Sequence, residues 1–176
     1  SPLNSVSLYG DTKKVAELQV REEPNTVCYR FATGFGVSPC KRVNLLVNDL
    51  THQAVTNKCL NIFQADFKRT FVHVRDMAES FLFALRNYDQ MQDQKVYNVG
   101  SNDLNWTKRQ LAEYISEITG AFVSYADIGK DLDQRDYSVD YSKIEDAGFK
   151  CETSMEEGIQ ELIDVVPLLQ IRHQYL

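Results

Sequence analysis

The chain has 176 residues and a net charge of −6, and this length suits one domain that can bury a sizeable core. The acidic balance argues against a general nucleic-acid binder, which shows a basic surface, and no apolar run approaches the ~18 residues that suggest a membrane span. Four scattered cysteines without a C-x-x-C pair argue against a zinc site or a disulfide framework and favour reduced thiols in the cytoplasm.

Strand and helix patterns alternate along the chain, which favours an α/β fold. Runs rich in β-branched and aromatic residues predict strands over residues 26–31, 59–64, 70–74, 95–99 and 122–125. Amphipathic segments predict helices over residues 7–20, 43–56, 75–87, 107–119 and 142–147, and a last helix from Ser154 that ends or kinks at Pro167. Residues 32–39 contain glycines and are expected to form a loop.

Two of these helices carry clear start signals. Thr107 with Gln110, and Ser154 with Glu157, have the spacing of a capping box. Gly120 follows the first of these helices at the place where a glycine commonly ends one.

Tyr9 and Lys13 are four residues apart at the start of the first predicted helix. Side chains at this spacing lie on one helix face, a turn apart. A nearby ammonium favours the ionised form of a phenol, and a phenolate is a usable base. The pair alone is a weak signal, because many solvated helices carry it by chance and two polar surface residues would explain it equally well.

The residues around this pair make the signal more specific. Residues 1–17 read S-P-L-N-S-V-S-L-Y-G-D-T-K-K-V-A-E. This stretch resembles the active-site helix of the extended short-chain dehydrogenase/reductases, which include nucleotide-sugar epimerases and dehydratases. The resemblance implies that Tyr9 is the catalytic acid/base and that Lys13 holds the nicotinamide ribose and tunes the tyrosine. It also implies NAD as the cofactor, with NADP as the alternative, and a homodimer formed through this helix.

A glycine-rich turn such as G-x-G-x-x-G, which receives the pyrophosphate in a Rossmann domain, does not occur in the sequence. We therefore expect the chain to be the C-terminal portion of a longer protein, whose remainder would supply most of the cofactor site and the family's catalytic Ser or Thr. On this interpretation residues 1–31 end a Rossmann-like parallel sheet. Residues 32–176 form mainly a small mixed α/β substrate-binding lobe, with some elements that return to the sheet.

Two further segments resemble substrate and cofactor contacts of the family. The segment R-F-A-T-G-F-G from Arg30 resembles R-x-x-N-x-x-G-P, which implies that Phe31 and Thr33 lie at the cofactor and that Thr33 also contacts substrate. Thr33 replaces the usual Asn and Val37 the usual Pro, so the substrate is uncertain on this point. Asn44, in N-L-L, resembles a contact to the nucleotide diphosphate, although an asparagine there often only caps a helix.

The segment K-R-T-F-V-H-V-R-D-M-A from Lys68 resembles the family's R-D-F-I-H-V-x-D-V-A. The resemblance implies that Arg69 binds the substrate diphosphate, which suits a guanidinium fork. His73 and Asp76 are expected to be framework residues. Arg135 falls where relatives place a late arginine that contacts the nucleotide.

Two functions of different class follow from these observations. The first is an NAD-dependent nucleotide-sugar epimerase that works by transient oxidation, or a related dehydratase or reductase; Leu8, directly before Tyr9, supplies no acid and favours the epimerase. The second is a non-catalytic binding module. In both cases we expect this polypeptide alone to be inactive, because the pyrophosphate cradle is missing from it.

Overall fold

The computed structural model describes residues 7–40, 42–126 and 136–168. Its helices are α1 (Leu8–Glu22), α2 (Leu46–Asn57), α3 (Val74–Arg86), α4 (Tyr88–Met91), α5 (Lys108–Thr119), α6 (Ser142–Asp146) and α7 (Met155–Val165), with 3-10 turns at Asn102–Leu104 and Val166–Leu168. Its strands are β1 (Cys28–Phe31), β2 (Thr33–Phe35), β3 (Cys59–Phe63), β4 (Lys68–His73), β5 (Val96–Val99), β6 (Asn105–Thr107) and β7 (Phe122–Ala126). The predicted alternation of helices and strands is confirmed, and the fold is α/β.

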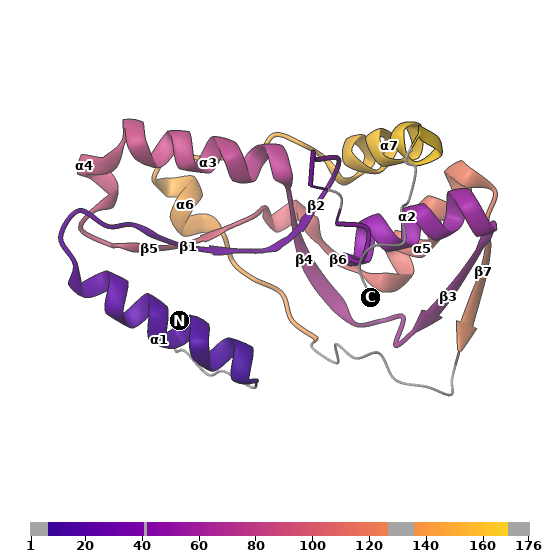
Figure 1. The fold of residues 1–176 in the computed structure, drawn as a ribbon, viewed down its shortest axis with the longest axis horizontal. Coiled ribbons are helices and arrows are strands. Elements are labelled where there is room, and N and C mark those ends of the chain that lie inside the picture. The colour runs from indigo at the N-terminus through magenta and orange to yellow at the C-terminus, as the bar shows by residue number, and fades with distance from the viewer. Residues whose placement is uncertain (1–6, 41, 127–135, 169–176) are drawn as a thin grey trace.

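The strands are short and form three small groups. β1 pairs with β5 and β3 pairs with β7, in both cases in parallel, while β4 lies between a parallel β2 and an antiparallel β6. In Figure 1, α1 lies on one side of the β1–β5 pair, and α3 and α6 lie on the other. The mixture of parallel and antiparallel pairing agrees with the predicted parallel sheet plus mixed lobe, whereas the division at residue 31 stays a prediction.

The described residues bury two apolar clusters. One lies around β5 and α6, and its buried members are Met91, Tyr97, Val99, Tyr141, Ile144 and Phe149. The other is larger and joins α2, α5 and α7 to the strands β2, β3 and β4. Each cluster therefore holds one end of the elongated molecule together (Figure 1).

The predicted helix-capping residues begin and end their helices as expected. Both capping boxes form: the Oγ1 of Thr107 accepts from the Gln110 N–H, and the Oγ of Ser154 accepts from the Glu157 N–H. Gly120 ends α5 in the left-handed region, with φ of 69°. The loop predicted over residues 32–39 is partly wrong, because residues 33–35 form β2 beside β4. Such a short strand depends on its distant partner rather than on its own sequence.

His73 connects β4 to the C-terminal helix α7. Its side chain is buried, and its Nδ1 accepts a hydrogen bond from the backbone N–H of Arg75 at 3.3 Å. Its Nε2 lies 3.3 Å from Oε2 of Glu161. A Cβ added at Gly36, which has φ of +106°, would lie 2.1 Å from this Nε2, so the histidine fits only against a glycine. His73 is thus a framework residue, as the sequence predicts.

Burial lowers the pKa of His73, and the nearby Arg75 acts in the same direction, while the carboxylates of Glu161 and Asp76 oppose this change. The unfolded chain takes up a proton near pH 6.5, where the buried ring stays neutral. Stability is therefore complete above this pH and falls as the pH drops below it, by up to about 1.4 kcal/mol per pH unit for one proton. We expect urea denaturation of His73→Gln to show a smaller loss of stability between about pH 7 and pH 5.5 than the wild type.

Thr51→Val is the matched control, because Thr51 is a buried polar residue of α2 that carries no titratable group. This variant should lose stability with falling pH as steeply as the wild type. An equal slope in His73→Gln would contradict the assignment of the effect to His73.

Candidate active site

Tyr9 and Lys13 lie on the same face of α1. The helix starts with Ser7, whose Oγ accepts the N–H of Gly10 at 3.1 Å. The Lys13 Nζ lies 5.4 Å from the centroid of the Tyr9 ring, and the ring itself is 71% exposed. The two side chains therefore point toward one another, and the phenol is open to a ligand.

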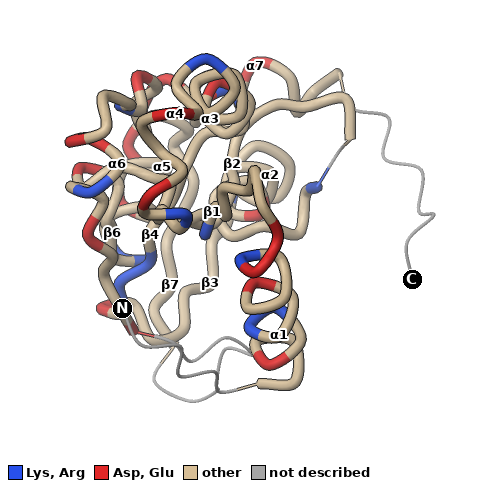
Figure 2. Tube along the Cα trace, turned by 90° about the vertical axis from the view of Figure 1, so that its left-hand side faces the viewer, with Lys and Arg blue, Asp and Glu red and all other residues tan. Residues whose placement is uncertain are grey.

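An ion pair attaches α1 to β1. The Nε and Nη2 of Arg30 donate to the two carboxylate oxygens of Glu17, each at 2.7 Å. This hydrogen bonding holds the pKa of Glu17 below its ordinary value. The helix carries acidic and basic residues along its length (Figure 2), and none of its residues is buried.

α1 runs antiparallel to β1, so its N-terminal end lies toward the end of β1 (Figure 1). Phe31 is the last residue of β1, and its ring contacts Tyr29 and Phe81 at centroid distances of 5.6 and 5.5 Å. Thr33 begins β2 opposite Phe71 of β4. Between them, Ala32 donates its N–H to Val99. Tyr9 and Lys13, and Phe31 and Thr33, thus come to one end of the β1–α1 unit.

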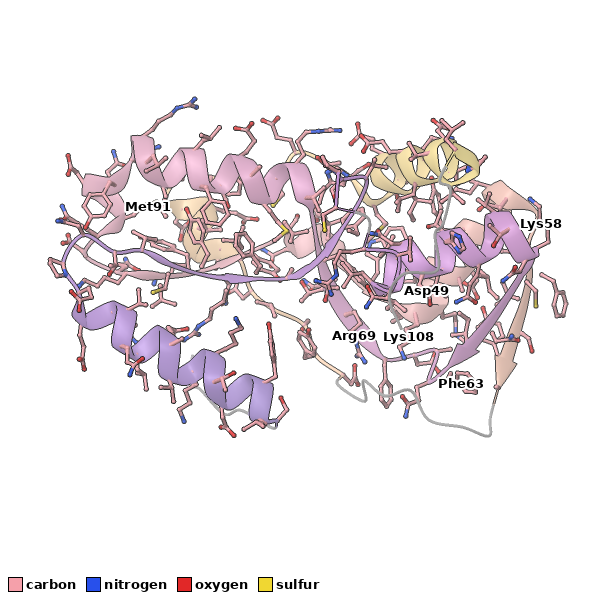
Figure 3. All side chains as sticks on the ribbon, viewed as in Figure 1. Asp49, Lys58, Phe63, Arg69, Met91 and Lys108 are labelled. Atoms are coloured by element: carbon pink, nitrogen blue, oxygen red, sulfur yellow. The ribbon has the colours of Figure 1, made fainter. Side chains whose placement is uncertain are left out.

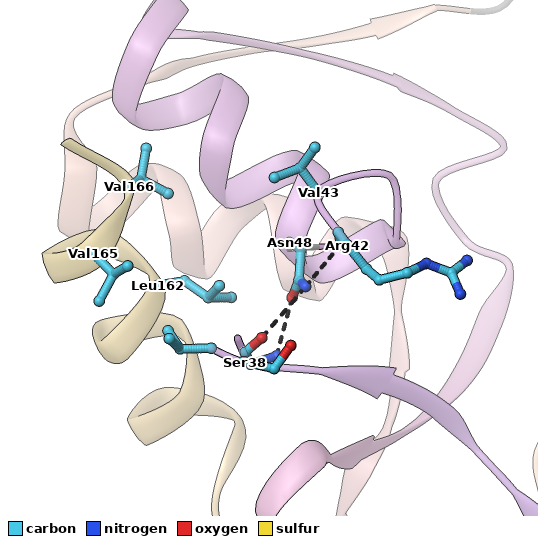
Figure 4. Close-up of a pocket in the computed structure, with 9 residues that line it drawn as sticks. Ser38, Arg42, Val43, Asn48, Leu162, Val165 and Val166 are labelled. Carbon is cyan, nitrogen blue, oxygen red and sulfur yellow. Dashed lines mark hydrogen bonds between the residues drawn. The ribbon is translucent and has the colours of Figure 1, made fainter. Parts of the chain in front are cut away.

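The loop after β2 is held by Asn48, a residue that the sequence analysis missed. The Oδ1 of Asn48 accepts from the Gly36 N–H at 3.0 Å, and its Nδ2 donates to the carbonyls of Gly36 and Arg42 at 3.5 and 3.0 Å. Figure 4 shows these bonds beside a cavity of about 30 Å³, which also touches Leu162 and Val166 of the C-terminal segment. A buried amide among the apolar positions of α2 is the signal that could have identified it.

Asn44 does not cap α2, which was the alternative to its expected contact with the nucleotide diphosphate. Asn44 is exposed in the turn before α2, and the residue at the N-cap position is Leu45, which has no side-chain cap bond. The helix starts at Leu46, three residues later than predicted, and Asn48 in its first turn bonds back to the preceding loop. Asn44 is exposed in this turn, and its expected contact with the nucleotide diphosphate stays a prediction.

Arg69 lies on β4, the middle strand of the group formed by β2, β4 and β6. Its side chain is only 3% exposed, its Nη1 donates to the Lys68 carbonyl at 2.9 Å, and its guanidinium carbon lies 6.0 Å from the Tyr137 ring. Lys108 is a second buried cation that was not predicted, and its Nζ donates to the Phe63 carbonyl at 3.2 Å (Figure 3). Arg135 lies outside the described residues.

Asp76 is a framework residue, as the sequence predicts, because its carboxylate bonds to the protein backbone. Its carboxylate accepts the backbone N–H groups of Glu152 and Thr153 at 3.1 and 3.2 Å. It therefore joins the first turn of α3 to the segment that leads into α7.

Comparison with known proteins identifies the family of this chain. The profile of the NAD dependent epimerase/dehydratase family matches residues 1–100, which is more than half of the chain. The chain belongs to this family.

Solved structures share the fold. A UDP-glucose 4-epimerase from Thermotoga maritima with UDP-glucose aligns with a TM-score of 0.72 and 22% identity, over 94% of this chain and 55% of that one. A dTDP-glucose 4,6-dehydratase from Bacillus anthracis in complex with NAD aligns with a TM-score of 0.78 and 20% identity, over 96% of this chain and 55% of that one. RMD from Pseudomonas aeruginosa, complexed with NADPH, aligns with a TM-score of 0.67 and 19% identity, over 90% of this chain and 55% of that one. The chain thus spans about half the length of these structures.

Within the residues that the structure describes, no helix combines the length and the apolar character that crossing a membrane requires.

Replacement of Asn48 tests the structure of the loop. Asn48→Ala leaves the buried Gly36 N–H without its acceptor and removes the bond to the Arg42 carbonyl. We expect it to lower the free energy of unfolding by about 1–3 kcal/mol and to speed proteolytic cleavage near residues 36–42. Asn57→Ala, at the exposed end of α2, should change neither property. Equal stability of the two variants would show that the Asn48 bonds do not hold this loop.

Proposed function

We propose that this chain is the C-terminal part of an NAD-dependent enzyme that acts on a nucleotide sugar, with epimerisation as its reaction. The observation that carries the proposal is the pairing of an exposed Tyr9 with Lys13 at the end of β1, within a member of a family named for epimerases and dehydratases. The UDP-glucose and NAD found with similar structures support the substrate and cofactor classes.

The residues at this end of α1 suit the nicotinamide-ribose half of NAD or NADP. A phenol, an ammonium and the hydroxyl of Thr33 are donors of the kind that ribose hydroxyls accept, and Phe31 offers an aromatic edge. The sequence has no glycine-rich turn for the pyrophosphate, so the rest of the cofactor would bind to a part outside residues 1–176. When bound, the nicotinamide supplies a reversible hydride acceptor.

In the proposed mechanism, Tyr9 holds and moves the proton. Its phenolate oxygen takes the proton from a sugar hydroxyl as that carbon is oxidised and returns it when the carbonyl is reduced. Lys13 holds its ammonium beside the tyrosine ring and would grip the ribose. Because Lys13 lies against the Tyr9 ring, one helix turn sets both functions.

Substrate binding is proposed for Thr33, Asn44, Arg69 and Arg135. Arg69 would hold the diphosphate, because a guanidinium offers paired donors to phosphate oxygens. Its burial in the described structure means that the substrate would reach it within the lobe rather than at the surface. Anchoring the diphosphate at a distance from the reacting carbon would position that carbon for the chemistry.

Epimerisation is preferred to dehydration because Leu8, next to Tyr9, provides no acid to expel water. A dehydratase or a reductase of the same family is the alternative, and a dehydratase occurs both among the similar structures and in the family name. A homodimer in the cytoplasm is part of the proposal, and the exposed Leu8, Val15 and Leu18 of α1 support helix-to-helix contact.

The catalytic assignment can be tested in the enzyme that contains this chain. Tyr9→Phe removes the proton-carrying oxygen and should reduce kcat by about 100-fold or more, while Lys13→Met should reduce it and also weaken cofactor binding. Tyr88→Phe changes a tyrosine of α4, which lies on the other side of the β1–β5 pair from α1 (Figure 1); it is the control and should keep full activity. Wild-type turnover by Tyr9→Phe, measured on a panel of nucleotide sugars, would refute the mechanism.

The chain by itself gives a second test, which separates the enzyme from a non-catalytic module. We expect isothermal titration of the 176-residue chain with NAD to show no stoichiometric binding, because the pyrophosphate cradle is lacking. Stoichiometric NAD on the purified chain would contradict this expectation. Binding of a UDP-sugar without turnover, in the full-length protein as well as in the chain, would instead favour the non-catalytic module.

A further inference from the structure

A polar groove of about 760 Å³ lies beside α1, away from the proposed active site. Its floor comes from β1 and β5, where Arg30 and Asn98 are register partners. Arg21, in the last turn of α1, forms one wall, and residues 138–143 form the other. Since α1 starts near Tyr9 and ends near Arg21, the groove and the proposed catalytic pair lie at opposite ends of one helix.

Positive charge gathers in this groove although the whole chain carries −6. Arg21, Arg30 and Lys143 line it, and Asp140 is the carboxylate among its described lining residues. The Oδ1 of Asp140 accepts from the N–H and Oγ of Ser142 at 2.9 and 2.7 Å, so it is engaged at the start of α6. Outside the lining, the single carboxylate of Glu17 offsets charge on both arginines: it lies 2.7 Å from the Nε of Arg30 and 3.9 Å from the Nη1 of Arg21. The groove thus keeps an excess of cations.

Contacts of two lysines, Lys143 and Lys95, hold the walls of the groove in place. The Nζ of Lys143 donates to the carbonyls of Val96 and Gln94 at 2.5 and 3.4 Å and lies 4.6 Å from the centroid of the Tyr97 ring. The Nζ of Lys95 donates to the Arg21 carbonyl at 3.0 Å, which fixes the backbone of that wall.

The field in the groove is positive at Lys143. Burial lowers the pKa of Lys143, and the charges of Arg30 and Arg21 lower it further. Each of these cations therefore gains from the arrival of an anion, which relieves their mutual repulsion.

We propose that this groove binds a small phosphorylated anion through Arg21, Arg30 and Lys143. Its volume falls in the range of small-molecule sites, roughly 300–1,000 Å³. Guanidinium groups suit phosphate oxygens, and Asn98, Gln94 and Ser138 add neutral donors. The apolar lining is limited to Val96 and Val139 among the described residues, which favours a compact, highly charged ligand over an apolar one. The proposal shares no residue with the proposed catalytic or substrate-binding set, so it stands or falls separately from it.

Titration of the 176-residue chain with pyrophosphate, at constant ionic strength, tests this proposal. We expect saturable binding by isothermal titration calorimetry and a matching rise in Tm, with inorganic phosphate weaker than pyrophosphate. Arg21→Gln should weaken binding by about tenfold, the effect of losing one charged hydrogen bond. Because Arg21 is exposed, this variant should fold as the wild type does. Lys143→Met should weaken binding at least as much.

Arg86→Gln is the matched control, since Arg86 is also an exposed arginine in the last turn of a helix, on α3. It should bind pyrophosphate as the wild type does. Equal weakening by Arg21→Gln and Arg86→Gln would reveal general charge attraction and overturn the proposal. No saturable binding of pyrophosphate to the wild type, or binding only of an acidic peptide, would overturn it as well.

Discussion

The ion pair between Glu17 and Arg30 determines where the proposed catalytic residues lie. None of the residues of α1 is buried, so apolar packing contributes little to fixing this helix. Two charge-assisted hydrogen bonds of 2.7 Å join it to β1 instead. Both partners are half-buried, and such a bidentate pair contributes about 1–3 kcal/mol, more than an exposed one would. The distance between Tyr9 and the end of β1 therefore depends on a contact two helix turns away from the tyrosine.

The sequence predicts those parts of the fold that depend on near neighbours. The capping residues Thr107 and Ser154 act within one turn, and their helices begin where expected. β2 and β6 were missed because each is three residues long and forms only against β4, more than thirty positions away in both cases. The start of α2 was predicted at residue 43 but falls at Leu46, and Asn48 in its first turn bonds back to the loop at Gly36. Long-range pairing, rather than propensity, decided each of these positions.

The same distinction holds in the candidate site. The juxtaposition of Tyr9 and Lys13 follows from helix geometry and was predictable from four letters of sequence. The burial of Arg69 and Lys108 was not. Arg69 is buried on β4 opposite Trp106 of β6, and Lys108, at the start of α5, reaches the distant carbonyl of Phe63. Residue type suggested a phosphate contact for Arg69, but only the fold shows that its guanidinium lies within the lobe near Tyr137.

Arg30 takes part both in the attachment of α1 to β1 and in the cationic groove. It holds Glu17, which positions the helix, and it also lies on the floor of the cationic groove. An anion in that groove would compete with Glu17 for the same guanidinium, so it would loosen the attachment of α1 to β1. By reciprocity, whatever tightens α1 on β1 would reduce the affinity of the groove for the anion by the same factor. The size of this coupling is bounded by the Glu17–Arg30 interaction itself, because no larger differential contact joins the two sites through this residue.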